Sequence, residues 1–490
     1  MNESKVRAAF PSATIHKTVT ATTLMNFLEL SADVKSWLLQ KFTDKDGVLQ
    51  AFDLSEYVKE MRLKPNDWNL KLLEARHTAG GQIKLLTKVK IEFDYANDEL
   101  CFSLPEYGFP KKKGEGVLDW SVVSEHKKQL LNADGAWGEI TLSYDCGRTQ
   151  LIEFSPLCPY TTNLREYQNG RKQFTTAEWI DVLLAGLNFN PDAMNEEEKL
   201  TLLQRFLPSV EKRMNQLELS IKGSAKSYCY SQLSVYNWLT SGTVSRATAF
   251  YNNTTKAVGY FGKYDNVIWD ECQTLKCANP EEMTGVLKPY LESGEIRIGN
   301  YCGTADAGLT LVGNIPCGQM DIEKHNMFST LPKMFNESAF IDRFSGIIEG
   351  WKIGRFSEER KFEGWGLSAN YLTELFHEMR EEFYYRAIID ELLEVEGNCD
   401  ARNFEAIKKN CTAFLKLLFP HVKSVKDVEI EDFKKYCLEP AIRMRWGVLC
   451  QLRHLDEEYA NVEMPVIKVK EIKNELAEGE ESKDDNGTGK

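Results

Sequence analysis

The chain has 490 residues, of which 42% are hydrophobic and 27% charged, and its formal net charge is −13. This ordinary globular composition is enough for about two to four domains with buried cores, and it excludes a collagenous, a fully disordered or a disulfide-stapled chain. The charge is uneven, because residues 1–130 carry a net +1 and the remainder −14. The N-terminal part can therefore present a local basic face.

The apolar segments are short. The longest runs, 309–312 and 414–419, are far below the roughly 20 residues that a membrane-spanning helix needs. The N-terminus has no basic segment followed by a long apolar stretch, so we expect no secretory signal, no membrane partner and a cytoplasmic location. The 12 cysteines are scattered without any Cys-x-x-Cys spacing, and we expect reduced thiols, no disulfides and no zinc.

The pattern of residues 1–155 indicates helices followed by strands. Apolar residues with helical spacing predict small helices at 23–28, 33–42 and 53–61. The period then changes, and it predicts strands of a β-rich module at 83–93, 99–104 and 137–144. Between these strands lies the run Lys111-Lys112-Lys113, which either contacts nucleic-acid phosphates or is only a solvated turn.

Proline and glycine in residues 156–170 predict a linker, after which a new domain begins. Thr175 and Glu178 have the spacing of a capping box, so a helix should start here, and residues 196–206 continue the helical pattern. Amphipathic segments predict long helices near the C-terminus at 404–419 and 430–453. The polar, charged tail within residues 461–490 is expected to be disordered, above all from Lys470 onward.

The central motif predicts a phosphate-binding loop. An apolar strand at 217–221 is followed by the loop Gly223-Ser224-Ala225-Lys226-Ser227-Tyr228 and a helical continuation. In such loops the backbone amides bind phosphates, the lysine reaches the terminal ones and the hydroxyl holds Mg²⁺. Against the pattern G-x-x-x-x-G-K-[ST], Ser220 and Ala225 replace the two glycines. An ordinary strand-to-helix turn is the alternative interpretation.

Polar residues that follow later strands favour the nucleotide site. Asp270 and Glu271 follow a buried strand at 266–269, where the aspartate can orient Mg²⁺ and the glutamate can polarise water; a helix cap is the alternative. Asn314 ends another buried strand and can position that water. Arg343 suits the arginine-finger role toward a neighbouring subunit, and Arg402 lies near the start of a later helix. Their order and spacing predict an AAA+ ATPase.

The same residues carry a resemblance to a known family. The motifs are Gly170-Arg-Lys-Gln-Phe-Thr-Thr-Ala-Glu-Trp-Ile-Asp, the loop at 223–228, Ala249-Phe-Tyr-Asn-Asn, Gly259-Tyr-Phe-Gly, Trp269-Asp-Glu, Tyr290-Leu-Glu-Ser-Gly-Glu, Val312-Gly-Asn-Ile and Ala339-Phe-Ile-Asp-Arg. In this order they resemble the BrxL family of bacterial BREX phage-defence systems. The resemblance runs from about residue 5 to 455.

The resemblance implies an α/β fold, namely an AAA+ P-loop ATPase core with a parallel sheet flanked by helices, related in architecture to minichromosome-maintenance helicases. It implies the following organisation: an α+β N-terminal module of DNA-binding type at 1–155, the ATPase core at 170–388, a helical lid at 389–460 and the acidic tail at 461–490. It further implies ATP and Mg²⁺ as cofactors, and a hexameric ring or double ring that encloses double-stranded DNA. Other defence-system proteins are expected partners.

By the same resemblance, Arg402 corresponds to the second sensor arginine, which with Arg343 stabilises the transferred charge. Residues 292–302 correspond to a hairpin that points into the ring channel, and Arg297 is its candidate DNA contact. Longer members continue into a Lon-protease-like domain. This chain ends soon after Tyr459, so we expect a short form without peptidase activity.

Three functions stay open at this point. The first is an ATPase ring that binds or translocates on duplex DNA. The second is a scaffold that binds ATP but hydrolyses it weakly, since a serine at position 220 could strain the loop if the turn there needs unusual backbone angles. The third is a DNA-binding ring without motor activity, in which residues 1–155 carry the affinity.

Overall fold

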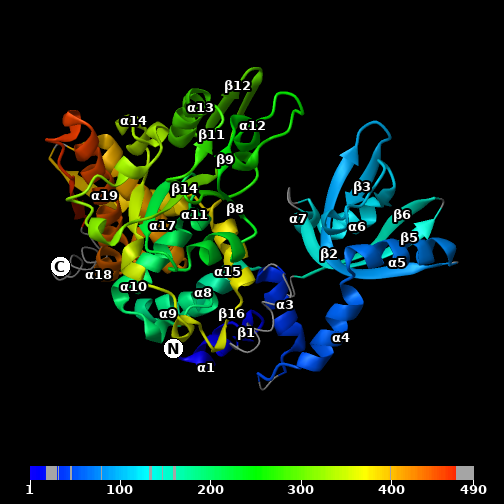
Figure 1. Cartoon of the computed structure of the whole chain (residues 1–490). Helices are drawn as coiled ribbons and strands as arrows, with labels where there is room; N and C mark the ends of the chain where they lie inside the picture. The colour runs from blue at the N-terminus through cyan, green and yellow to red at the C-terminus, as the bar shows by residue number, and fades with distance from the viewer. Residues whose placement is uncertain are drawn as a thin grey trace, which may run out of the picture.

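The computed structural model describes residues 1–17, 30, 32–44, 47–78, 80–131, 135–145, 147–157, 162–397 and 399–470. These residues form a large body and a smaller β-barrel beside it, with α3 (Ala32–Phe42) and α4 (Ala51–Met61) between them (Figure 1). Both helices confirm predicted ones. The helix predicted at 23–28 and the tail from residue 471 lie outside the described residues. No helix in the described part of the chain combines the length and apolar character needed to cross a membrane.

Five strands close the barrel in the order β2-β3-β4-β6-β5, and the strands predicted from the sequence are β2, β3 and β5. The bounds are β2 (Gln82–Asp94), β3 (Glu99–Ser103), β4 (Gly116–Leu118), β5 (Ala136–Asp145) and β6 (Arg148–Pro156). β4 and β6 pair in parallel, and the other neighbours are antiparallel. With α6 (Trp120–Glu125) between β4 and β5, this is the Greek-key order of the OB-fold. Trp68 of α5 (Pro65–His77) completes the barrel core.

The first 17 residues pack against the large body, although they belong to the segment 1–155 that was predicted as one module. β1 (Thr14–Lys17) pairs antiparallel with β16 (Gly364–Leu367). Val6 of α1 (Glu3–Ala9) and the following Phe10 lie in the core of the large body. The buried Lys17 donates to the carbonyl oxygens of Ala185 and Gly186 at 2.8 and 2.7 Å. Pairing between such distant segments leaves no signal in local periodicity.

The large body is built on a five-stranded parallel sheet in the order β15-β7-β14-β10-β8. Its strands are β7 (Gln216–Ser220), β8 (Asn237–Thr240), β10 (Asn266–Trp269), β14 (Gly308–Asn314) and β15 (Gly346–Glu349). β7, β10 and β14 confirm three predicted strands. Most residues in the central strands are buried, as in parallel sheets covered by helices on both faces. Numbered along the chain, the order is 5-1-4-3-2.

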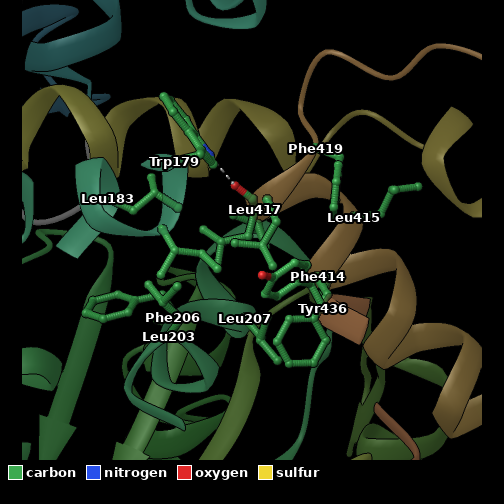
Figure 2. Close-up of a cluster of buried hydrophobic side chains, with 14 of the residues drawn as sticks. Trp179, Leu183, Leu203, Phe206, Leu207, Phe414, Leu415, Leu417, Phe419 and Tyr436 are labelled. Carbon is green, nitrogen blue, oxygen red and sulfur yellow. Dashed lines mark hydrogen bonds between the residues drawn. The ribbon is translucent and has the colours of Figure 1, made fainter. Parts of the chain in front are cut away.

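A large apolar cluster joins the helices that precede the sheet to those that follow it. Figure 2 shows Trp179 and Leu183 of α9 (Thr176–Gly186) close to Leu417 of α17 (Ala401–Leu418). The indole N–H of Trp179 donates to the carbonyl oxygen of Leu417 at 3.2 Å. The predicted capping box of Thr175 and Glu178 is present at the start of α9. The C-terminal helices are therefore part of the core of the large body.

The other helices and strands are short or lie at the edges of these layers. Their bounds are α7 (Lys127–Leu130), α10 (Glu196–Leu203), α11 (Leu207–Val210), β9 (Thr243–Val244), α12 (Arg246–Ala249), β11 (Lys276–Cys277), α13 (Pro280–Ser293), β12 (Glu295–Ile298), β13 (Tyr301–Thr304), α14 (Ser338–Ile341), α15 (Ala369–Met379), α16 (Tyr384–Leu392), α18 (Ile430–Phe433) and α19 (Glu439–Leu455). β12 and β13 form a hairpin that overlaps the one expected at residues 292–302. The helix predicted at 430–453 is divided, because a π-helix (Lys434–Leu438) separates α18 from α19.

Two segments expected to be irregular contain regular structure. The predicted linker includes α8 (Leu164–Arg171), which Asn163 caps and in which Tyr167 is buried. The predicted disordered tail includes β18 (Val466–Val469), which pairs antiparallel with β17 (Leu393–Glu396). Both elements are stabilised by segments far away in the sequence. Local composition therefore gave the wrong expectation for them.

Candidate functional site

The predicted phosphate loop leaves the carboxyl end of β7, and a short helical segment begins at Lys226. Gly223 and Ala225 have φ angles of 79° and 59°, so the loop contains two residues in the left-handed region. The carbonyl oxygen of Gly223 accepts a hydrogen bond of 2.8 Å from the amide of Phe356. Among the described residues, no partner accepts from the amides of Gly223, Ser224 and Ala225. A run of such amides can bind an anion.

The structure corrects the expectation that Ser220 strains this loop. Ser220 is the last residue of β7, fully buried and in strand conformation, so it needs no glycine. The unusual backbone angle belongs to Ala225, where an L-residue adopts a conformation that favours glycine. The strain therefore lies directly before the lysine.

This strain gives a first prediction. Ala225→Val is expected to lower the free energy of unfolding by about 1–3 kcal/mol, because a β-branched side chain is disfavoured in the left-handed region. The matched control, Ala225→Gly, should stay within about 0.5 kcal/mol, since relief of strain offsets the greater entropy of glycine in the unfolded chain. Urea unfolding of the three proteins would measure both changes. Equal stabilities for the valine and glycine variants would contradict the assignment.

Lys226 and Asn314 come together at the carboxyl ends of neighbouring strands. The ammonium of Lys226 donates to Oδ1 of Asn314 and to the carbonyl oxygen of Ile221, at 3.1 Å each. Partial burial lowers the pKa of Lys226, and the charges of Glu218 and Asp270 oppose this effect. The sequence placed both residues in one site, and the structure puts them in direct contact.

Asp270 and Glu271 follow β10, on the far side of β14 from the loop. Oδ1 of Asp270 accepts from the amide of Glu271 at 2.8 Å, and Glu271 has an exposed side chain and a φ of 51°. Non-glycine residues in this conformation are uncommon and often occur at functional sites. Gln273, which no sequence signal marked, donates to the carbonyl oxygen of Asn314 at 2.5 Å and so fixes the backbone of that residue.

The last two loop residues have different environments. Ser227 is exposed at the start of the helical segment, and its carbonyl oxygen accepts from the hydroxyl of Ser231 at 2.6 Å. Tyr228 packs edge-on against Phe189, with ring centroids 5.8 Å apart, and its hydroxyl accepts from the amide of Asn188 at 2.5 Å. Burial raises the pKa of the Tyr228 hydroxyl. Tyr228 therefore anchors the helical segment, whereas Ser227 is accessible to a ligand.

Arg343 and Arg402 form a separate cluster. Both pair with Glu292, at 2.5 and 3.4 Å, and Arg402 also pairs with Asp342 at 2.8 Å. The hydrogen bond with Asp342 raises the pKa of Arg402. The carbonyl oxygen of Arg343 accepts a hydrogen bond of 3.4 Å from the side-chain amide of Asn215. Asn215 directly precedes β7, whereas Lys226 follows β7.

These two arginines are therefore not brought together with Lys226. The five-residue strand β7 separates the two ends by roughly 15 Å at about 3.3 Å per residue. The arginine cluster lies at the amino end of the parallel strands, and the loop lies at their carboxyl end.

The candidate DNA contacts lie elsewhere. Lys111 donates to Asn69 at 3.1 Å, and Lys113 pairs with Asp94 at 2.9 Å, so two lysines of the run are engaged within the barrel. Lys112 is exposed in the same turn. Arg297 is 73% exposed on β12 and pairs with Glu295 at 2.9 Å. The run precedes β4 of the barrel, and Arg297 belongs to the hairpin of the large body.

Known proteins resemble both parts of the chain. A family model described as "Lon-like protease BrxL-like, ATPase domain" matches residues 149–465, and one described as "BREX system Lon protease-like protein BrxL N-terminal" matches residues 8–144. The boundary between the matches lies between the end of β5 and the start of β6.

Two curated relatives, both named Lon-like protease BrxL, are similar over much of the chain. The protein from Escherichia coli O9:H4 (strain HS) is 28% identical over 384 residues, which cover 76% of this chain and 53% of the relative. The protein from Bacillus cereus (strain H3081.97) is 30% identical over 326 residues, which cover 64% and 48%. The chain thus spans about half the length of the curated relatives it matches.

Proposed function

The chain belongs to the BrxL family, and from this premise we propose that it is a Mg²⁺-dependent AAA+ ATPase of BREX phage defence whose rings bind or translocate on double-stranded DNA. The observation that carries the proposal is the placement of Lys226, Asn314 and Asp270 after three neighbouring parallel strands. The parallel sheet supports it further, because ligands of open α/β sheets bind outside the carboxyl ends of the strands.

The loop residues bind the nucleotide. The amides of Gly223, Ser224 and Ala225, together with Lys226, hold the β- and γ-phosphates. Tyr228 fixes the start of the helical segment through Phe189 and Asn188. Glu271 polarises the attacking water as a general base, and Asn314, held by Gln273, orients it.

Oxygen ligands for Mg²⁺ are available beside the loop. The Ser227 hydroxyl is exposed at the start of the helical segment, and the Asp270 carboxylate is close enough to Lys226 to influence its pKa. Hydroxyl and carboxylate oxygens are ligands that Mg²⁺ prefers, so these residues fit the ion. Mg²⁺ bound there neutralises charge on the phosphate oxygens.

The remote position of Arg343 and Arg402 supports a ring. Because both lie at the opposite end of β7 from Lys226, they serve the site of a neighbouring subunit, where they stabilise the transferred charge. Glu292 and Asp342 keep the two guanidinium groups together. A hexameric ring or double ring supplies this neighbour at every site.

Lys111, Lys112, Lys113 and Arg297 are the proposed DNA contacts, and other BREX proteins are the proposed partners. Lys113 is 76% exposed even though it pairs with Asp94, so a phosphate can compete for it. The barrel has the OB-fold order, which other proteins use to bind nucleic acids. Phosphate contacts of this kind make affinity fall steeply with salt.

Steady-state ATP hydrolysis, with and without long duplex DNA, tests the proposal. We expect turnover that needs Mg²⁺, stops when EDTA removes the metal, and rises with DNA at low salt. Lys226→Ala should lose this turnover. Lys276→Ala is its matched control, because it removes an exposed lysine of the large body outside the proposed site. Its turnover should equal that of the unmodified chain.

Each other outcome points to a different function. ATP binding with negligible turnover would favour the scaffold that recruits defence proteins. DNA binding that ignores ATP would favour a ring without motor activity. No binding of ATP by the unmodified chain would refute the proposal.

A further inference from the structure

A charged pair lies fully buried beneath the phosphate loop. Arg205, between α10 and α11, and Glu218, in the middle of β7, both have 0% exposed side chains. The guanidinium contacts both carboxylate oxygens, through Nη2 at 2.6 Å and Nε at 3.0 Å. The hydroxyl of Tyr230 donates to the same carboxylate at 2.7 Å. Glu218 is thus held on two sides, and it fixes the plane of the guanidinium.

The free edge of that guanidinium reaches the loop. Nη1 of Arg205 donates to the carbonyl oxygen of Ser224 at 2.8 Å, and Nη2 lies 3.4 Å from its hydroxyl. Ser224 is itself 1% exposed, and its hydroxyl also donates to the carbonyl of Ile221 at 3.1 Å. The loop is therefore tied down at the residue between Gly223 and Ala225.

This contact determines where a loop amide points. In a trans peptide, the carbonyl of one residue and the N–H of the next point in opposite directions. The Ser224 carbonyl points inward to Arg205, so the N–H of Ala225 points outward, away from the core. Ala225 has the left-handed φ of 59°, a conformation that persists only where surrounding contacts enforce it.

We infer that Arg205 is a positioning residue for phosphate binding. Glu218 orients Arg205, and Arg205 fixes the Ser224 carbonyl and so holds the Ala225 amide toward the ligand. The inference rests on the proposed function, since it requires the loop to bind phosphate groups. Arginine suits this task because its planar fork can contact a carboxylate and a carbonyl at once, which a lysine ammonium cannot do in the same geometry.

The charge of Arg205 favours a persistent hydrogen bond to the Ser224 carbonyl. Burial tends to lower the pKa of Arg205, but the negative charge of Glu218 raises it above the usual value. Arg205 therefore remains a cation with its donors available. A buried pair of this kind is weak evidence for stability, because apolar residues of similar volume often replace such pairs without loss. This property allows the positioning role to be separated from a merely structural one.

The test uses a triple variant, Arg205→Met with Glu218→Leu and Tyr230→Phe, which removes both charges and the hydroxyl that depends on them. We expect a melting temperature close to that of the unmodified chain, but a dissociation constant for a fluorescent ATP analogue that is raised at least tenfold. Arg205→Lys keeps the buried charge pair and should also weaken analogue binding tenfold. If the triple variant does not fold, Arg205→Lys alone tests the inference.

The matched control is Lys416→Met, which breaks another buried contact, the 2.9 Å pair with Glu211, away from the loop. It should lower the melting temperature and leave the dissociation constant unchanged. Analogue binding of unmodified strength in Arg205→Lys and the triple variant would overturn the inference and leave the proposed function standing. Failure of the unmodified chain to bind the analogue would overturn both.

Discussion

ATP turnover is expected to fall by about 10²- to 10⁴-fold when Glu271 is replaced by glutamine, the range typical of a lost general base. Glu271 follows β10 with an exposed side chain, next to Asp270, so the change removes a charge without disturbing a core. ATP binding should stay within about twofold, because the phosphates are held by the loop and Lys226. Single-turnover hydrolysis and equilibrium binding of ATP measure the two effects separately.

Two further variants serve as references for the Glu271→Gln experiment. Lys226→Ala should lose ATP binding itself, because its ammonium is the only side-chain cation that the same chain contributes to the proposed phosphate site. Glu281→Gln, at an exposed position at the start of α13, makes the same chemical change outside the site and should leave turnover unaltered. If Glu271→Gln lost binding together with turnover, Glu271 would be a structural residue and not the base.

The sequence predicted those parts of the site that follow strands. β7, β10 and β14 are short buried runs, and polar residues come directly after them. Because the carboxyl ends of parallel strands meet at one edge of a sheet, Lys226, Asp270 and Asn314 could be assigned to one site before the structure was known. The capping box of α9 was equally visible, since it depends on residues three apart.

Contacts between distant segments were not predictable in this way. Arg205 and Glu218 are charged residues with apolar neighbours. A charge in a buried strand signals a partner, but nothing in the sequence identifies that partner. The pairing of β1 with β16 and of β17 with β18 is likewise non-local. The motif alone suggests backbone strain at Ser220. Strain depends on the backbone angles, however, and these place the strained residue at Ala225.

Replacing Arg343 by alanine is expected to reduce turnover by about 10³- to 10⁵-fold, the range for loss of an arginine finger. Arg343 pairs with Glu292 and lies beyond the amino end of β7, so it cannot be a ligand of the phosphate loop in its own subunit without a large rearrangement. Its loss should leave ATP binding nearly intact. Arg213→Ala is the control for a general disturbance of this region. It removes an arginine near the same end of β7, and the guanidinium of Arg213 donates a hydrogen bond to the Ser293 carbonyl.

Mixing two inactive variants distinguishes action in the neighbouring subunit from action within one chain. Lys226→Ala keeps the arginine and loses the loop, whereas Arg343→Ala keeps the loop and loses the arginine. In mixed rings, some interfaces combine an intact loop with an intact Arg343, so turnover should return on mixing although each variant alone is inactive. Rings that assemble from both variants but stay inactive at every ratio would show that Arg343 does not act across the interface, because complementation requires only that the two intact groups meet.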